Sequence, residues 1–99
     1  MRKSIELIVV ERNRQIEVEG YSFRHDQDEN GEGQLSIAAA CYAVNKILPP
    51  KLYVIDPYSS DAFPWGKEYD KREKHDRLHS LVIAGALIAA EIDLSLIHI

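Results

Sequence analysis

The segment from Leu81 to Ala90 most constrains the fold, because it is apolar on every side of a helix. Apolar residues also recur every three or four positions from Leu78 to Ile92, which predicts a helix over residues 72–93. A helix that is hydrophobic all round must be buried all round. The rest of a 99-residue chain supplies too few helices to cover it. We therefore expect the helices to pack in a homo-oligomer.

Two more helices are predicted upstream of this segment. The spacing of Ile5, Ile8, Val9 and Ile16 favours a helix over residues 4–19. The same region could alternate as two strands, but it lacks the Asn-Gly or Asp-Gly turn typical of a hairpin. Gly20 is predicted to end this helix in a left-handed conformation. Residues 21–33 are predicted to be a polar loop, and residues 34–48 a helix that stops at a Pro-Pro pair.

Residues 49–70 contain four prolines and several aromatic residues without helical periodicity, and they predict a long connection. The fold class expected from these elements is all-α, a single domain over residues 1–93 with three to four small helices. The last six residues, 94–99, read Leu-Ser-Leu-Ile-His-Ile and look like a translated sequencing adapter. We interpret them as a non-native tail.

Charge and cysteine content exclude several classes of protein. Twelve Lys and Arg against sixteen Asp and Glu give a net charge of −4, which argues against general nucleic-acid binding. The single cysteine, Cys41, excludes an internal disulfide and is typical of a reducing cytoplasm. No uninterrupted apolar run reaches the roughly 18–20 residues of a membrane span, so no membrane partner is predicted.

Two motifs have the spacing of metal ligands, but neither predicts a metal site. His75 and His79 are four residues apart, as in zinc-binding helices, but no third ligand can be named. Asp26 to Gly31 matches the first half of a calcium loop. Its twelfth position should be a bidentate Glu and is Ile37 instead. We predict neither a metal nor another cofactor.

Local groups of cationic and aromatic residues indicate a small anionic ligand of the nucleotide type. Guanidinium and ammonium groups bind phosphates, and aromatic rings stack on bases. The alternatives are surface ion pairs and an aromatic lid that only completes the core. The predicted phosphate ligands are Arg12, Arg14, Arg24, Lys71 and Arg77. Tyr21 or Trp65 is predicted to stack on the base, and His25 and Asp26 to contact a ribose or a base edge.

The motifs Glu11-Arg12-x-Arg14-Gln15, Glu19-Gly20-Tyr21 and His25-Asp26 resemble a small family of uncharacterised phage and prophage proteins. The resemblance continues through residues 34–43, Pro64-Trp65 and residues 81–92. This copy differs at four positions, where family members have an acidic residue, two tryptophans and a basic residue. Those positions are Gln34, Tyr69, Asp70 and Ile83. The resemblance implies a protein that acts in the cytoplasm of a bacterial host.

More remotely, the chain is similar to the all-α nucleotide pyrophosphohydrolases of the MazG type. Those enzymes hold Mg²⁺ with carboxylates on two helices, and the corresponding helix from Gln34 to Leu48 carries none. The resemblance therefore implies a nucleotide-shaped fold without the metal site.

Three functions follow as hypotheses. The first is a phage-encoded, non-catalytic protein that sequesters a nucleotide-type molecule, such as a host immune signal. The second is a metal-dependent nucleotide hydrolase that uses Glu11, Glu19, Asp26 and Glu91. The third is an inhibitor that binds a host protein.

Overall fold

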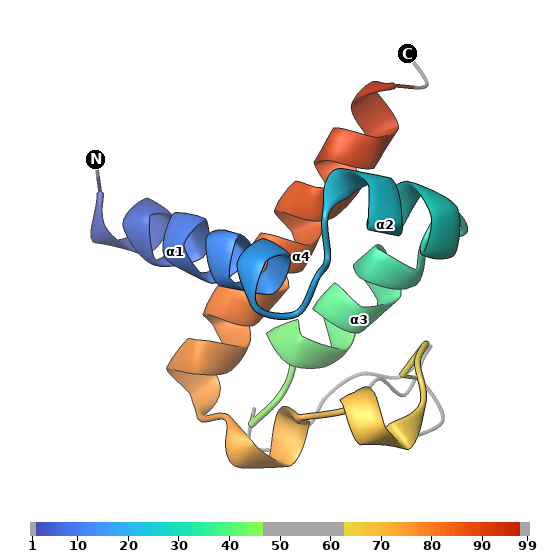
Figure 1. Cartoon of the computed structure of the whole chain (residues 1–99). Helices are drawn as coiled ribbons and strands as arrows, with labels where there is room; N and C mark the ends of the chain where they lie inside the picture. Colours follow the sequence, from blue (N-terminus) through green and yellow to red (C-terminus); the bar gives the residue numbers. More distant parts are fainter. Residues whose placement is uncertain (1, 47–62, 98–99) are drawn as a thin grey trace.

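The computed structural model describes residues 2–46 and 63–97, and every regular element within these ranges is helical (Figure 1). The predicted all-α class is therefore confirmed. The predicted connection lies mostly outside the described residues, since residues 47–62 are not described. In chain order, the elements are α1 (Lys3–Glu17), α2 (Phe23–Glu29), α3 (Gln34–Ala43), the 3-10 turns η2 (Lys67–Tyr69) and η3 (Arg72–Lys74), and α4 (Arg77–Leu96).

Helix α4 is the centre of the fold, and the other three α-helices all contact it. Helix α3 packs along α4 to form the core, in which Leu35, Ala38 and Tyr42 cluster with Ile83 and Leu87. Helix α1 crosses α4 as a separate layer, as Figure 1 shows. Gly85 permits this crossing, because a Cβ there would lie 2.7 Å from Cδ1 of Ile8.

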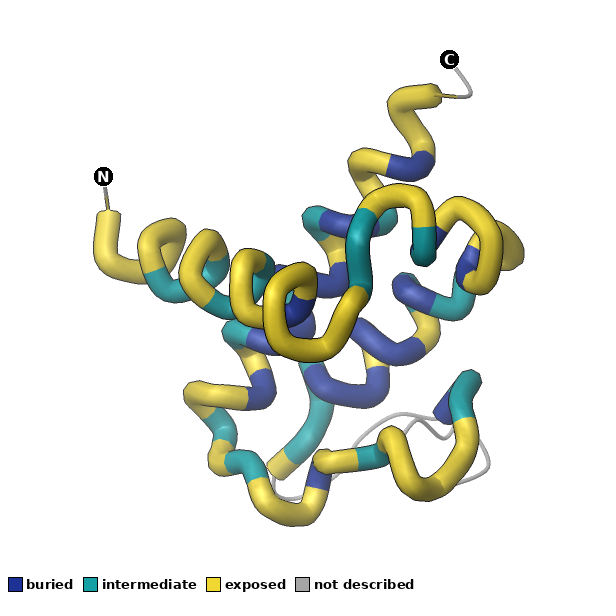
Figure 2. The backbone as a smooth tube through the Cα atoms, viewed as in Figure 1, coloured by how far each residue is buried: buried dark blue, intermediate teal, exposed yellow. Residues whose placement is uncertain are grey.

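The crossing leaves much of α1 and α4 open to solvent, as the yellow stretches in Figure 2 show. On α4 the side chains of Leu78, Leu81, Ile88 and Ile92 are 58%, 43%, 42% and 53% exposed. Within the described residues, one chain therefore does not cover α4 on every side, as the sequence analysis expects, and the predicted burial in a homo-oligomer stays a prediction. One face of α4 packs in the core, and the opposite face, which Ile8 of α1 approaches at Gly85, keeps exposed apolar side chains.

Helix α2 corrects the prediction that residues 21–33 form a polar loop. Ser22 caps this helix, because its hydroxyl accepts a hydrogen bond from the backbone N–H of His25 at 3.2 Å. Asp26, in the middle of α2, is only 1% exposed and contacts Arg12 of α1. A buried ion pair thus fixes a segment whose composition is polar.

The helix ends also differ from those predicted. Helix α4 begins at Arg77 rather than at residue 72, because the Asp76 carboxylate caps it by accepting the His79 N–H at 2.8 Å. It continues past the predicted end at Asp93 to Leu96, and Leu94 lies in the core. Helix α3 ends at Ala43 instead of residue 48, and a turn follows over residues 44–46. Gly20 has the predicted left-handed conformation, with φ of 78°.

By length and composition alone, α4 could cross a membrane, and 33% of its most apolar stretch is buried in the protein. The sequence prediction considered only uninterrupted apolar runs, whereas this helix includes polar residues. A single helix of this kind is weak evidence for a membrane span, because core helices of soluble proteins also meet the criterion.

Candidate functional site

A cavity of about 410 Å³ lies between α2 and the segment that carries Trp65 and Tyr69. Its volume falls in the range of about 300–1,000 Å³ that is usual for small-molecule sites. Aromatic side chains form much of its lining. Tyr21 stacks on the His25 ring at 5.4 Å between centroids, and the ring of Trp65 lies 6.4 Å from that of Tyr21. The lining consists of Glu19, Tyr21, His25, Glu29, Asn30, Trp65 and Tyr69.

A chain of buried and half-buried polar contacts holds these aromatic residues in place. Arg12 donates to the carbonyl oxygen of Tyr21 at 3.0 Å and to Oδ2 of Asp26 at 3.2 Å. The other Asp26 oxygen accepts from Nδ2 of Asn30 at 3.1 Å. Oδ1 of Asn30 accepts in turn from Trp65 Nε1 at 3.0 Å. The position of the indole therefore depends on an ion pair that lies behind it.

The polar groups that line this cavity include two carboxylates, which only accept hydrogen bonds, and two tyrosine hydroxyls, which can donate or accept. Glu19 pairs with Arg14 through one oxygen at 3.0 Å, and the Glu29 carboxylate is exposed. His25 Nδ1 lies 3.4 Å from Asp26 Oδ1. In the neutral tautomer that donates through Nδ1, this contact leaves Nε2 as an acceptor. Among the described residues that line the cavity, none is Lys or Arg. Its lining therefore complements a ligand that presents hydrogen-bond donors.

A smaller cavity of about 90 Å³ adjoins the first and shares Glu19, Tyr21, Trp65 and Tyr69 with it. Its cationic groups come from Arg14, whose side chain is 45% exposed, and from the exposed Lys71. The remaining lining residues are Glu11, Gln15, Tyr42, His75, Ile83 and Leu87. The two cavities thus join an aromatic site to cationic side chains at the protein surface.

Ionisation in the smaller cavity follows from burial and from neighbouring charges. Burial tends to raise the pKa of Glu11, but hydrogen bonds and charge from Arg14 outweigh it, so the pKa falls below its usual 4.5. Burial, together with the positive charge of Lys74, lowers the pKa of His75 from its usual 6.5. At neutral pH, therefore, Glu11 is ionised and His75 is mostly uncharged.

Gln15 is a lining residue that the sequence analysis did not single out. It is 3% exposed, and its Nε2 donates to Oε2 of Glu11 at 3.1 Å. Its Oε1 is buried and has no hydrogen-bond partner among the described residues. A polar residue in a predicted helix is expected to face solvent, so only the packed structure reveals that Gln15 is buried.

The structure brings five of the nine predicted site residues to these two cavities. Tyr21, His25 and Trp65 line the larger cavity, and Arg14 and Lys71 line the smaller one together with Tyr21 and Trp65. Arg12 and Asp26 are paired behind the cavities.

Arg24 and Arg77 line neither cavity. Arg24 is exposed on α2. Arg77 donates through its guanidinium to the backbone carbonyls of Ala43 and Asn45. This contact ties the end of α3 to the start of α4, which is a structural position rather than one beside the aromatic residues.

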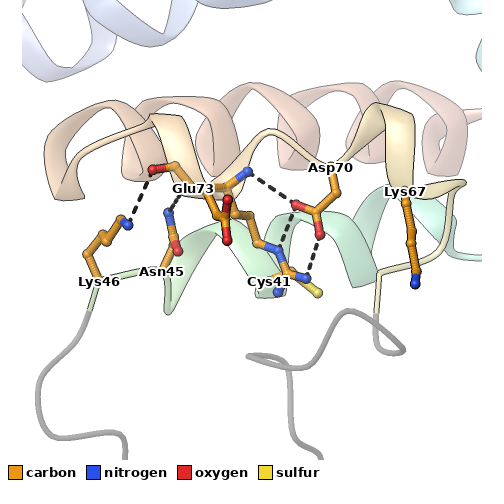
Figure 3. Close-up of a pocket in the computed structure, with 7 residues that line it drawn as sticks. Cys41, Asn45, Lys46, Lys67, Asp70 and Glu73 are labelled. Carbon is orange, nitrogen blue, oxygen red and sulfur yellow. Dashed lines mark hydrogen bonds and ion pairs between the residues drawn. The ribbon is translucent and has the colours of Figure 1, made fainter.

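Another cavity, of about 430 Å³, lies beside Cys41 and the 3-10 turn η3 (Figure 3). Several of its polar side chains contact protein groups: Asp70 pairs with Arg72 at 2.7 Å, and Lys46 donates to the carbonyl of Glu73 at 3.4 Å. Cys41 is buried, and burial raises the pKa of its thiol, as expected for a structural cysteine. The described lining has no aromatic ring that could stack on a planar ligand.

The two motifs with metal-ligand spacing do not form metal sites in the structure. Asp26 and Asp28 belong to α2 instead of a calcium loop, and His75 precedes the cap of α4. Across residues 2–46 and 63–97, no group of three or more His, Cys, Asp or Glu side chains is placed to hold a metal ion. Of the carboxylates in the hydrolase hypothesis, Glu11 and Glu19 pair with Arg14, and Glu91 borders a different cavity.

Comparisons with known proteins add no relative. No protein-family profile, curated protein or solved structure matches this chain. The resemblances to a phage family and to MazG-type enzymes thus rest on the sequence motifs given above.

Proposed function

We propose that this protein is a phage-encoded, non-catalytic binding protein that sequesters a nucleotide-type small molecule, such as a host immune signal. The observation that carries the proposal is the joining of an aromatic cavity to a smaller one bordered by Arg14 and Lys71. Nucleotides combine a flat base with an anionic phosphate, and the two cavities offer a surface for each part.

In this proposal the base occupies the larger cavity and stacks on Trp65 or Tyr21. Stacking of a base on an aromatic side chain contributes about 1–3 kcal/mol. The phosphate lies at the surface, beside the exposed Lys71 and the half-exposed Arg14. Arg14 already pairs with Glu11 and Glu19, so Lys71 is the cation most available to the ligand. Its ammonium group donates to no residue within the described ranges.

Isothermal titration with GMP, AMP, a cyclic dinucleotide and ADP-ribose tests this function. We expect at least one of them to bind, and mass spectrometry to recover it intact after incubation. Trp65→Leu should weaken binding about tenfold or more through lost stacking. Tyr69→Leu gives a second test at an exposed ring, 54% accessible, whose loss should not disturb folding.

Phe23→Leu is the matched control, because Phe23 is a 40% exposed aromatic residue of α2 that lines neither cavity. Its affinity should equal that of the unmodified protein. The proposal is wrong if none of the four nucleotides binds. It is also wrong if Trp65→Leu and Tyr69→Leu both bind as tightly as the Phe23 control.

A further inference from the structure

The larger cavity combines aromatic rings with negative charge. The charged side chains of its described lining are the carboxylates of Glu19 and Glu29. Glu19 meets Arg14 at 3.0 Å, so most of its charge is balanced. The exposed carboxylate of Glu29 has no ion pair or hydrogen bond within residues 2–46 and 63–97. The described part of the chain therefore leaves a negative charge unbalanced at the rim of the cavity.

The ionisation of Tyr21 reflects its surroundings in this cavity. Burial raises the pKa of its hydroxyl above the usual 10, and the negative charge of Glu19 adds to the rise. The positive charge of Arg14 opposes both effects and is weaker than either. Tyr21 thus stays a neutral ring at physiological pH. A neutral aromatic ring has a negative face, which attracts cations.

The rings offer a ligand their faces more than their polar groups. Nε1 of Trp65 already donates to Oδ1 of Asn30 at 3.0 Å, so the half-buried indole has no free donor. Its ring lies 6.4 Å from that of Tyr21, and the ring of Tyr69 is mostly exposed. A flat ligand that enters between these residues therefore meets π surface, with carboxylates at the edge.

Positive charge is found on the other side of the shared aromatic residues. Arg14 and Lys71 line the smaller cavity and are absent from the described lining of the larger one. The site is therefore polarised: its aromatic end is negative, and the end proposed for the phosphate is positive. A nucleotide with a cationic base and an anionic phosphate has the complementary polarity.

We propose that the aromatic cavity selects a nucleotide whose base carries a positive charge, as an N-alkylated purine or a pyridinium ring does. This inference rests on the proposed function, because it places the base on Trp65 or Tyr21 and the phosphate beside Lys71. The positive ring is attracted to the aromatic faces and to the carboxylate of Glu29. A neutral base of the same shape keeps the stacking and loses both attractions.

Comparison of 7-methyl-GMP with GMP tests the inference on the unmodified protein. The two nucleotides differ by one methyl group at N7, which gives the base its positive charge. Titration calorimetry at pH 6 is suitable, because the methylated base then keeps its N1 proton and its charge. We expect GMP to bind measurably and 7-methyl-GMP to bind about tenfold more tightly.

The variant Glu29→Gln separates the effect of charge from that of the added methyl group. Glutamine keeps the size of the side chain and removes its charge. We expect the preference for 7-methyl-GMP over GMP to fall about threefold, as for an exposed charge pair, while the Tm stays level. Glu32→Gln is the matched control, because Glu32 is an exposed carboxylate that lines neither cavity. It should leave the preference unchanged.

Each outcome decides the inference. A preference for 7-methyl-GMP that falls only in Glu29→Gln supports it. Equal binding of the two nucleotides overturns it and leaves the proposed function standing. A preference that changes equally in the two variants, or in neither, assigns the gain to other contacts and also overturns the inference. If none of the four nucleotides named above binds, the proposed function fails, and the inference fails with it.

Discussion

At the scale of single residues, some charged side chains that were predicted to bind the ligand instead contact other protein groups in the structure. Arg12 was predicted to bind phosphate, and the structure pairs it with the buried Asp26 while it holds the backbone of Tyr21. Arg77 ties α3 to α4 through two carbonyls. Guanidinium groups with several donors serve such junctions well, because one side chain can satisfy several acceptors. Arg12 and Arg77 thus have protein partners in the structure, and their predicted contact with phosphate stays a prediction.

The ion pair between Asp70 and Arg72 predicts a pH dependence of stability. Asp70 accepts from Nε of Arg72 at 2.9 Å and from its Nη2 at 2.7 Å. These hydrogen bonds lower the pKa of Asp70 below its usual 3.8. A carboxylate with a lowered folded pKa stabilises the protein above its unfolded pKa, and that contribution is lost as the pH falls through the folded pKa.

We expect Asp70→Asn to lower the free energy of unfolding by about 2 kcal/mol at pH 7. The difference in unfolding free energy from the unmodified protein should begin to shrink as the pH falls below about 4, where the unfolded chain takes up a proton at Asp70. It should be lost once the pH has fallen through the lowered folded pKa. Urea unfolding followed by circular dichroism at pH 7, 5 and 3.5 measures it. Asp28→Asn, at an exposed position of α2, is the control and should change stability little at any pH. A constant difference between Asp70→Asn and the unmodified protein would contradict the charge argument.

At the scale of elements, the crossing of α1 over α4 depends on the absence of a side chain at Gly85. A Cβ at this position would lie 2.7 Å from Cδ1 and 2.9 Å from Cγ1 of Ile8. We expect Gly85→Ala to lower the free energy of unfolding by about 1 kcal/mol, because overpacking outweighs the helix preference of alanine. In an Ile8→Ala background the same change should raise it by up to about 1 kcal/mol.

A double-mutant cycle by chemical denaturation measures this coupling. The reversal of sign identifies the contact with Ile8 as the reason for the glycine, because helix propensity alone acts equally in both backgrounds. An identical effect of Gly85→Ala in the two backgrounds would show that α1 moves aside without cost.

Apolar periodicity predicted α1, α3 and the body of α4, because the spacing of apolar residues reflects which helix face is buried. It missed α2, whose stability depends on Asp26 meeting Arg12 on another helix, a contact that no local pattern encodes. The start of α4 was misplaced because a charged run precedes it, and the cap at Asp76 sets the boundary. Tyr21 and Trp65 could be found from the sequence by ring chemistry. Gln15 could not, since only the packed structure shows that its oxygen is buried.

At the scale of the whole molecule, the apolar face of α4 argues for self-association. Leu78, Leu81, Ile88 and Ile92 follow a spacing of three or four residues with Gly85 at the centre, and all four are exposed. Ile8 of α1 approaches this face at Gly85, and the four apolar residues on either side of Gly85 along α4 stay exposed. Beside it, α1 exposes Ile5, Val9 and Ile16. Apolar patches of this extent mark interaction sites on soluble proteins.

We expect a second copy of the chain to cover this face, because a two-fold axis brings identical apolar surfaces together. We expect light scattering during gel filtration to give at least twice the 11.3 kDa mass of one chain. Ile88→Glu should shift the protein to a monomer, because it buries a charge at the proposed contact. Ile37→Glu, at a 46% exposed position on α3 and outside the face, should leave the assembly intact. The expectation of self-association is contradicted if the unmodified protein is a monomer at 100 μM. It is also contradicted if Ile88→Glu elutes at the same volume as the unmodified protein. Either result would show that the isolated chain tolerates this apolar surface in water.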